Sequence, residues 1–197
     1  MNQSNNKGVV FRHIRNVNND FYESSPVLAK YLLKVLTYVK QQKQYTCIDP
    51  SVGRGAIFKH LPEPKIGFDI SSKYLTNDNK YFVQDFLKVD LKFVKTNPSK
   101  NIVIGNPPFC SKNGENQLIN FINHASNLAK YIIFITPLNI NKIGPIRKVS
   151  NARLVDVYFL PKTCMNFVDS KGTEKKIIVC IQVWKTLTPD TRKLWLN

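Results

Sequence analysis

The chain has 197 residues, of which 43% are hydrophobic, and this length suits one well-packed domain. No apolar run approaches the roughly 20 residues of a membrane span, and the N-terminus lacks the apolar core of a signal peptide, so we expect a soluble intracellular protein. Lysine and arginine outnumber aspartate and glutamate by 29 to 13, which gives a net charge of +16. Such an excess favours a polyanionic partner, nucleic acid above all. A genome rich in A and T could explain the abundant lysines, but not the scarcity of acids.

The four cysteines are spread along the chain without the spacing of a metal site. They are Cys47, Cys110, Cys164 and Cys180. We therefore expect reduced thiols, with neither a disulfide nor a zinc site.

The N-terminal stretch differs from the rest of the chain. Residues 1–20 are polar and basic, and they form either a loose tail or an arm that lies on the partner. Residues 21–197 contain neither a repeat nor a low-complexity linker, so we interpret them as a single domain.

A helix is predicted after residue 25. Ser25 followed by Pro26 is a typical helix start, and the apolar residues at 28, 32, 35 and 36 fall on one face that would cover a sheet. Phe21 and Tyr22 lie just before this helix. They either border a small-molecule pocket or pack onto the start of the helix.

A short strand at residues 45–49 runs into a glycine turn at residues 50–55 and a helical segment at residues 56–60. In this arrangement backbone N–H groups meet the polar end of a ligand, and glycines allow close approach. Phe58 stands where a dinucleotide fingerprint has its third glycine, which disfavours an NAD site. Asp49 at the turn suits a cationic amine instead, such as the one on S-adenosylmethionine.

Two further strand-like stretches, residues 65–70 and 81–86, also lead into an acidic residue. Asp69 follows Asp49 by 20 residues, a spacing at which a carboxylate accepts hydrogen bonds from ribose hydroxyls. Asp85 can accept from an adenine amino group, and Phe86 can cover the ring. Three strand-end acids in register predict a site for a nucleoside-type cofactor.

An apolar, β-branched run at residues 102–105 ends abruptly in Asn106, Pro107, Pro108 and Phe109. The run predicts a buried parallel strand. Prolines cannot continue a strand ladder, so the tetrapeptide lies at the carboxyl end of the strand, the edge where open α/β sheets bind ligands.

The chemistry of this tetrapeptide fits a planar amino group. An exocyclic amine on a purine is a poor nucleophile because its lone pair is delocalised into the ring. The side-chain oxygen of Asn106 and the backbone carbonyl of Pro107 could both accept hydrogen bonds from it, which would localise the lone pair. Pro108 stiffens the turn, and Phe109 offers a face on which a base can stack. The alternative is a plain strand-ending turn with a core phenylalanine.

The C-terminal half continues the pattern of strands and helices. We expect a polar loop at residues 110–116 with Lys112 near the substrate, a helix at residues 115–130 and a doubly buried strand at residues 131–136. The basic segment at residues 139–150 includes Arg147, which either meets phosphates or is simply solvated.

A terminal pair of strands is predicted at residues 153–160 and 176–185, with a long loop at residues 161–175 between them. Phe167 on this loop either stacks on a base turned out of its helix or packs back onto the core.

Taken together, these motifs resemble S-adenosylmethionine-dependent amino-methyltransferases of the N6-adenine type. Residues 49–55 resemble the cofactor loop of that family and residues 106–109 its catalytic motif. The resemblance implies a Rossmann-like class I α/β fold, with a seven-stranded, mostly parallel sheet, an antiparallel last strand and helices on both faces. It also implies cofactor contacts from Phe21, Tyr22, Ser25, Asp49, Pro50, Gly53, Gly55, Asp69, Ile70, Asp85 and Phe86.

The chain departs from the family in one respect: we see no room for the separate target-recognition domain that sequence-specific DNA members usually carry. We expect recognition through loops, the N-terminal arm or a partner subunit. Methylation of adenine N6 in DNA is the first choice and of adenine in RNA the second. A protein glutamine substrate is a third reading, although those enzymes usually end the motif in tyrosine. Methylation of cytosine N4 is disfavoured, because those enzymes commonly begin the motif with serine. A degenerate methyltransferase that serves as a binding subunit is disfavoured too, because it would have no need for the intact Asp49, Asp69 and Asp85.

Overall fold

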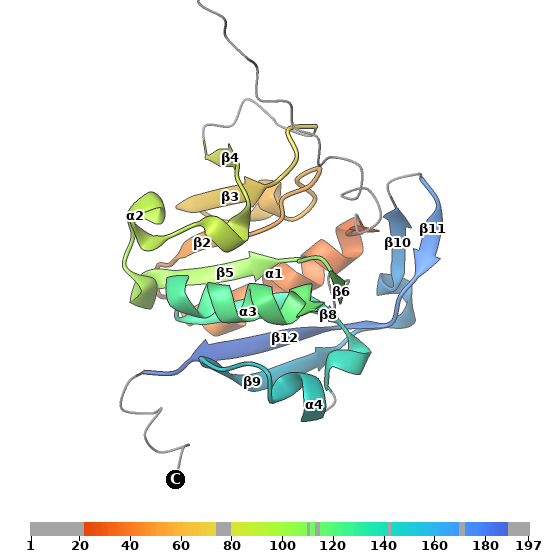
Figure 1. Cartoon of the computed structure of the whole chain (residues 1–197). Helices are drawn as coiled ribbons and strands as arrows, with labels where there is room; N and C mark the ends of the chain where they lie inside the picture. Colours follow the sequence, from red (N-terminus) through yellow and green to blue (C-terminus); the bar gives the residue numbers. More distant parts are fainter. Residues whose placement is uncertain are drawn as a thin grey trace, which may run out of the picture.

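The computed structural model describes residues 22–73, 80–109, 111–112, 115–141, 143–169 and 172–188. Residues 1–20, Phe21 and Cys110, for which we made predictions above, lie outside this part of the chain. Seven strands form the central sheet (Figure 1), and from one edge to the other they are β4 (Tyr81–Val83), β3 (Lys65–Asp69), β2 (Thr46–Asp49), β5 (Asn101–Gly105), β8 (Tyr131–Pro137), β12 (Val179–Thr186) and β9 (Ala152–Phe159).

The direction of the strands confirms the predicted fold class. β4, β3, β2, β5 and β8 pair in parallel, whereas β12 runs antiparallel to both of its neighbours, β8 and β9. The apolar, β-branched sequences of β5 and β8 form the centre, where Ile102, Val103 and Ile104 are fully buried. The structure is a Rossmann-like α/β fold with one antiparallel strand.

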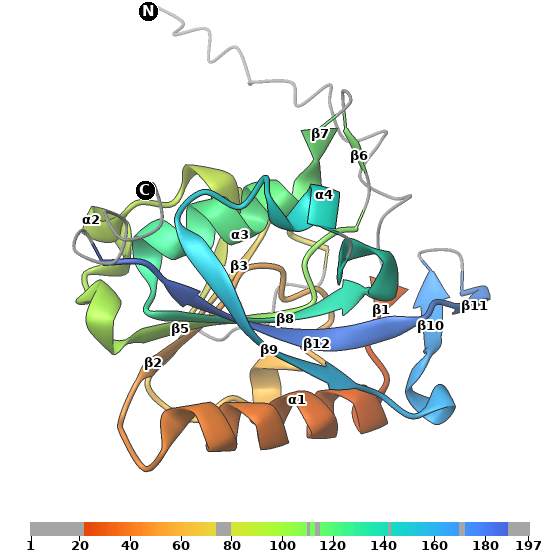
Figure 2. The ribbon, with the colours of Figure 1, turned by 90° about the horizontal axis from the view of Figure 1, so that it is seen from below.

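Long helices cover the sheet on opposite faces (Figure 2): α1 (Pro26–Lys40) on one and α3 (Gln117–Leu128) on the other. The Oγ atom of Ser25 accepts a hydrogen bond from the backbone N of Leu28 at 3.2 Å, and Pro26 occupies the first turn. The predicted helix start is therefore confirmed. Leu28, Leu32 and Leu36 of α1 are fully buried against the sheet, as the apolar spacing indicated.

The connection between β2 and β3 contains less helix than expected. In place of a helix at residues 56–60, it contains a single 3₁₀ turn, η2 (Phe58–His60). Phe58 is buried over Gly67 of β3, where an added Cβ would lie 2.6 Å from Val52 Cγ2 and 2.9 Å from Phe58 Cε2. The missing side chain at Gly67 thus makes the space that the bulky Phe58 requires.

A second, three-stranded sheet replaces the loop predicted at residues 161–175. Its strands, in order, are β1 (Tyr22–Glu23), β10 (Asn166–Asp169) and β11 (Glu174–Lys176), and all pairs are antiparallel. Figure 1 shows this small sheet on the side of the molecule toward which β5 points. The prediction of a loop was wrong, because the partner strand β1 comes from the opposite end of the chain.

The remaining elements are short. They are η3 (Phe86–Lys88), α2 (Leu91–Val94), η4 (Pro98–Lys100), β6 (Ser111–Lys112), β7 (Glu115–Asn116), η5 (Leu138–Asn141), α4 (Ile143–Ile146) and η6 (Lys162–Cys164).

No helix in the part of the chain that the structure describes has both the length and the apolar character needed to span a membrane. Cys47, Cys164 and Cys180 are buried thiols.

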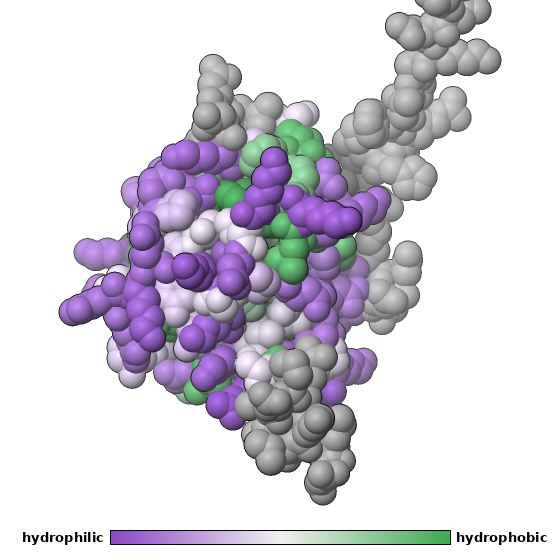
Figure 3. Space-filling view, turned by 90° about the vertical axis from the view of Figure 1, so that its left-hand side faces the viewer, coloured by the Kyte–Doolittle hydropathy of each residue, from purple (hydrophilic) through white to green (hydrophobic). Residues whose placement is uncertain are grey.

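An apolar surface lies at the edge of the sheet formed by β4 and the adjacent α2. Phe82, Val83 and Phe93 are each more than a third exposed, and the rings of Phe82 and Phe93 meet edge to face with centroids 5.2 Å apart. Figure 3 shows this apolar surface among hydrophilic side chains. It is separate from the carboxyl ends of β2 and β5, where the motifs lie.

Candidate cofactor and substrate site

The loop after β2 turns sharply and closes over the end of β3. Gly53 and Gly55 have φ angles of 55° and 78°, in the left-handed region that glycine adopts without strain. The backbone N of Gly53 donates to Asp69 Oδ2 at 2.7 Å, and the N of Val52 donates to the carbonyl of Phe68 at 3.0 Å. A Cβ added at Gly55 would meet no heavy atom within 4 Å, so the space beside this glycine is open.

Asp49 at the end of β2 is buried, with 1% of its surface exposed. Its Oδ1 atom accepts a hydrogen bond from the backbone N of Ser51 at 3.1 Å. Burial raises the pKa of Asp49 to about 7; the Ser51 N–H opposes this shift, and the nearby Asp69 adds to it. A cationic group bound beside this carboxyl would favour its ionised form.

Asp69 at the end of β3 uses both carboxylate oxygens to hold backbone. Oδ2 accepts from Gly53, and Oδ1 accepts from the N of Ser71 at 2.9 Å. Burial raises the pKa of Asp69, and the two backbone N–H groups partly offset the rise. A carboxylate oxygen has two lone pairs, so each oxygen retains the capacity to accept a second hydrogen bond, such as one from a ribose hydroxyl.

Tyr81 and Ile70 lie beside this acid. The hydroxyl of Tyr81 donates to the carbonyl of Ser71 at 3.2 Å. Burial, and after it the charge of Asp69, raises the pKa of Tyr81, which keeps the phenol neutral. Ile70, a predicted cofactor contact, is 55% exposed and follows directly after Asp69.

Asp85 and Phe86 follow β4 but have different environments. Asp85 caps η3, with Oδ1 accepting from the N of Leu87 at 3.1 Å. Phe86 is only 1% exposed, and its ring packs against those of Phe121 and His124 at centroid distances of 5.4 and 5.1 Å. The prediction that Phe86 covers a bound base is corrected: its ring belongs to the core.

The carboxyl end of β5 lies directly against the loop after β2. A Cβ at Gly105 would stand 2.8 Å from Asp49 Oδ1 and 3.0 Å from Pro50 Cδ, so the close approach of the two strand ends requires a glycine here. One residue further, the carbonyl of Asn106 accepts a hydrogen bond from Ser51 Oγ at 2.9 Å. This bond joins the predicted catalytic motif to the predicted cofactor loop.

The four residues of the motif differ in burial. The Oδ1 atom of Asn106 is shielded from solvent, and Pro107 is buried. Pro108 and Phe109 are half-buried, and the ring of Phe109 packs at the border of the core.

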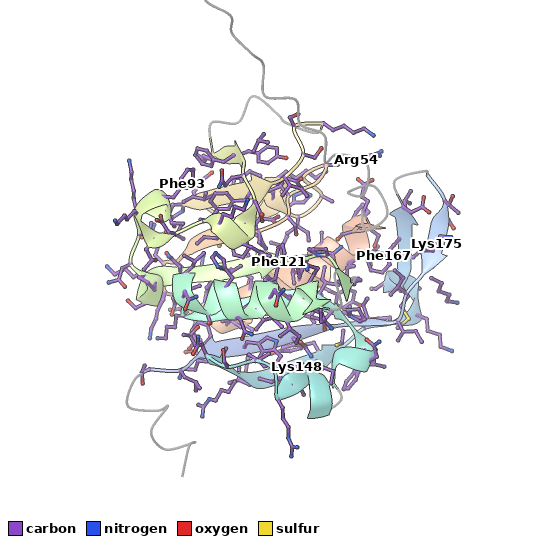
Figure 4. The ribbon with its side chains drawn as sticks, in the orientation of Figure 1. Arg54, Phe93, Phe121, Lys148, Phe167 and Lys175 are labelled. Carbon is purple, nitrogen blue, oxygen red and sulfur yellow. The ribbon has the colours of Figure 1, made fainter. Side chains whose placement is uncertain are left out.

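The small sheet is attached to the same loop. Glu23 of β1 forms an ion pair of 3.2 Å with Arg54, the residue between Gly53 and Gly55 in the loop. Figure 4 shows Arg54 between the central sheet and the small one. Tyr22 pairs with Asp169 through β1 and β10, and the ion pair of the neighbouring Glu23 brings this segment to the glycine turn.

Other predicted substrate residues are not brought to these contacts. Phe167 lies in β10 and is fully buried in the core, so the idea that it stacks on an extruded base is wrong. Arg147 is exposed just after α4, and Lys112 lies in β6, beyond the motif. Ser25, which was predicted as a cofactor contact, caps α1.

Two contacts of the site were missed by sequence reasoning: the Ser51–Asn106 hydrogen bond and the Glu23–Arg54 ion pair. The residues of the first are 55 positions apart, and neither residue type signals the other. Only the parallel pairing of β2 with β5, which brings the two strand ends side by side, could have suggested the contact.

The fold is that of the class I methyltransferases. A candidate RNA methyltransferase from Pyrococcus horikoshii is 14% identical with a TM-score of 0.63, over 85% of this chain and 87% of that one. A candidate class I S-adenosylmethionine-dependent methyltransferase from Listeria monocytogenes is 16% identical with a TM-score of 0.64, over 90% and 64%. The methyltransferase subunit of a type I restriction-modification system from Streptococcus thermophilus is 16% identical with a TM-score of 0.60, over 87% and 45%.

These likenesses concern the fold, since the identities are low. The sequence matches no protein-family model and no curated protein. The chain spans less than half of the restriction-modification subunit but most of the Pyrococcus protein.

Proposed function

We propose that this chain is an S-adenosylmethionine-dependent methyltransferase that methylates the N6 amino group of adenine in DNA. The observation that carries this proposal is the direct contact between the two motifs. Ser51 of the glycine loop donates to the carbonyl of Asn106, which begins the Asn-Pro-Pro-Phe motif. A methyl donor held at the loop would therefore lie next to the groups that would receive an amine.

The residues at the strand ends fit the cofactor. The open space beside Gly55 and the left-handed turn at Gly53 leave the backbone accessible to a ligand. Asp49 would face the cationic amine of the methionine end, and Asp69 would accept hydrogen bonds from the ribose. Asp85 would contact the adenine, and Tyr22, Ser25, Pro50 and Ile70 would border the site. When bound, S-adenosylmethionine supplies an electrophilic methyl group.

Asn106 and Pro107 would act on the substrate amine. The Asn106 side-chain oxygen, which is shielded from solvent in the structure, would have to turn toward the substrate on binding. It and the Pro107 carbonyl are both acceptors, and two acceptors on one NH₂ group draw its nitrogen toward tetrahedral geometry. They also stabilise the positive charge that develops on nitrogen during transfer. Pro108 stiffens the turn, and Phe109 at the border of the core would stack on the base. Because the amine attacks directly, no general base has to remove its proton first.

Charge supports a nucleic acid as the substrate. The net charge of +16 favours a polyanion, and Lys112 and the exposed Arg147 would meet phosphates. An adenine in a duplex would have to be flipped out, or be presented as a single strand. We propose that residues 21–197 form a single catalytic domain, with target recognition shared with the N-terminal arm or a partner subunit.

RNA is the second candidate substrate. It is supported by how much of each structurally similar protein this chain matches. The structurally similar Pyrococcus protein, described as a candidate RNA methyltransferase, is matched over 87% of its length, whereas the restriction-modification subunit is matched over 45%. Methylation of a protein glutamine is a weaker alternative, because the motif ends in Phe109 rather than tyrosine and the chain is strongly basic.

The decisive experiment is transfer of tritiated methyl groups to DNA, RNA and protein in parallel, followed by nucleoside analysis. We expect label in N6-methyladenine from DNA. Label confined to RNA would replace the first candidate with the second, and label in protein alone would refute a nucleic-acid substrate. Cofactor binding measured by calorimetry separates an active enzyme from a degenerate binding subunit.

A further inference from the structure

We propose that Ser51 is a positioning residue for methyl transfer, which fixes the Asn106–Pro107 peptide against the cofactor loop. This inference rests on the proposed function. It gives a role to Ser51, for which the family resemblance implied none. Its basis is the hydrogen bond of 2.9 Å from Ser51 Oγ to the carbonyl of Asn106.

The backbone of the motif has few means of being held. Proline has no backbone N–H, so the Asn106–Pro107 and Pro107–Pro108 peptides carry no donor. The carbonyl of Asn106 is therefore the only hydrogen-bonding group of its peptide plane. Ser51 binds this single group, and rotation of the plane would break the bond.

Ser51 is itself fixed at its other end. Its backbone N donates to Oδ1 of the buried Asp49 at 3.1 Å. The same Oδ1 atom lies against Gly105, where an added Cβ would come within 2.8 Å of it. A continuous series of contacts thus runs from the end of β2, through Ser51, to the end of β5.

The Asn106–Pro107 plane sets the position of both proposed acceptors. Asn106 precedes this peptide and Pro107 follows it, so a tilt of the plane moves the Asn106 side chain and the Pro107 carbonyl relative to the loop. A misplacement of about 1 Å can cost up to roughly a hundredfold in rate. The proposed cofactor contacts from Asp49 and Asp69 do not depend on the Ser51 hydroxyl. Loss of that hydroxyl should therefore lower kcat and leave cofactor affinity nearly unchanged.

The test compares Ser51→Ala and Ser51→Thr with a matched control, Thr37→Ala. Thr37 Oγ1 donates to the carbonyl of Leu33 at 3.0 Å on the exposed side of α1, so the control removes the same kind of bond far from the motifs. The measurements are kcat and KM with random-sequence single-stranded DNA and RNA, and the Kd of S-adenosylmethionine by calorimetry.

We expect kcat of Ser51→Ala to fall about ten- to a hundredfold, with the cofactor Kd within about threefold and KM little changed. Ser51→Thr, which keeps a hydroxyl, should recover most of the rate, and Thr37→Ala should match the wild type. A Ser51→Ala enzyme with wild-type kcat would overturn the inference. So would an equal loss of kcat and cofactor affinity, which would indicate a merely structural role.

A second measurement follows the bond itself. The sequence contains only two Asn-Pro pairs, Asn97–Pro98 and Asn106–Pro107. Labelling asparagine carbonyls with ¹³C and proline with ¹⁵N therefore gives two selected carbonyl signals. In Ser51→Ala the Asn106 signal should move, because its carbonyl loses a donor, while the Asn97 signal, whose carbonyl is held by Lys100 N at 2.8 Å, should stay.

An unmoved Asn106 signal would overturn the inference, whatever the protein methylates. A wild-type chain that transfers no methyl group to DNA, RNA or protein would instead refute the proposed function. The carbonyl signal would then still show whether Ser51 holds the peptide. The two failures are thereby distinguished.

Discussion

The central strand β5 carries an asparagine near each end, and the two amides have different surroundings. At the amino end, Asn101 is fully buried and its Nδ2 donates to Thr96 Oγ1 and to the carbonyl of Leu128, both at 2.8 Å. At the carboxyl end, Asn106 follows the strand and meets the loop of Ser51 through its own carbonyl. Asn101 therefore fastens α3 to one end of β5 through its side chain, whereas Asn106 joins the other end to the glycine loop through its backbone.

The amino end of the sheet is fastened by further polar contacts. The N of Lys130 donates to the carbonyl of Asn101 at 3.0 Å, and Thr186 Oγ1 donates to the carbonyl of Ala129 at 2.6 Å. These bonds tie the end of α3 to β5 and β12. The comparison teaches that the polar contacts at the amino end join α3 to the strands, whereas those at the carboxyl end join the glycine loop to β3 and β5, beside the open space at Gly55.

The largest effect is expected from Asn106→Ala. If Asn106 holds the substrate amine, its loss should lower methyl transfer by roughly a hundred- to a thousandfold, the size seen when one preorganised transition-state partner is removed. Cofactor affinity and the thermal midpoint should stay close to those of the wild type. Rates from tritium transfer and Kd from calorimetry check this, and equal losses in both would contradict the assigned role.

Asp49, at the carboxyl end of β2, should make the free energy of unfolding depend on pH. Its pKa is about 7 in the folded protein against 3.8 in the unfolded chain. Below about pH 4 both states are protonated and the contribution is fully present; it is lost as the pH rises to about 7. Relative to Asp49→Asn, the free energy of unfolding of the wild type should fall by roughly 2 to 4 kcal/mol across this range.

Urea unfolding of both proteins at a series of pH values measures this difference. His124, whose pKa burial lowers, is present in both proteins, so its own titration cancels in the difference. Parallel stability curves for the two proteins would show that Asp49 ionises in the folded state as it does in the unfolded chain.

Asn101→Ala should distinguish the roles of the two ends of β5, because it should affect stability and not activity. It leaves the carbonyl of Leu128 without its donor, which should cost about 1–3 kcal/mol of stability. The rate per folded molecule should be unchanged, because the substitution lies at the end of the strand away from the motifs. Denaturant unfolding and tritium transfer measure the two quantities. A specific loss of activity here would break the contrast between the ends.

An effect of similar size, but on cofactor affinity, is expected from Asp69→Ala. Cofactor binding should weaken by about 1–3 kcal/mol, the cost of leaving ribose hydroxyls without an acceptor. Part of the loss would come through Gly53, whose backbone N is held by Asp69. Calorimetry decides the point, with Asp90→Ala, which caps the remote helix α2, as the control. Unchanged affinity would remove Asp69 from the cofactor site.

Sequence patterns predicted those parts of the fold that local chemistry determines. The unbroken apolar run of β8 predicted a doubly buried strand, and Ser25 with Pro26 predicted the start of α1. The acid at the end of β3 and the glycine turn were likewise predicted, and the contact between Gly53 and Asp69 confirms that they meet.

What the sequence did not predict depends on partners far along the chain. Phe167 was placed on a loop because β10 has no strong strand pattern, and it forms a strand only with β1 beside it. Phe86 carries no sign of which way its ring turns, and the aromatic residues of β3 and α3 determine that it is buried. Ser51 gave no signal, because a serine in a turn fits many hydrogen-bonding arrangements.

The pairing of Tyr22 with Asp169 also constrains the order in which the molecule can be completed during synthesis. A chain emerging from the ribosome offers β1 first, but its partner β10 only near the end, and β9 joins the main sheet only through the still later β12. Domains generally fold as units once their parts have emerged. A truncated translation product that stops before β10 would therefore display the glycine loop without the strand that anchors Glu23 beside it.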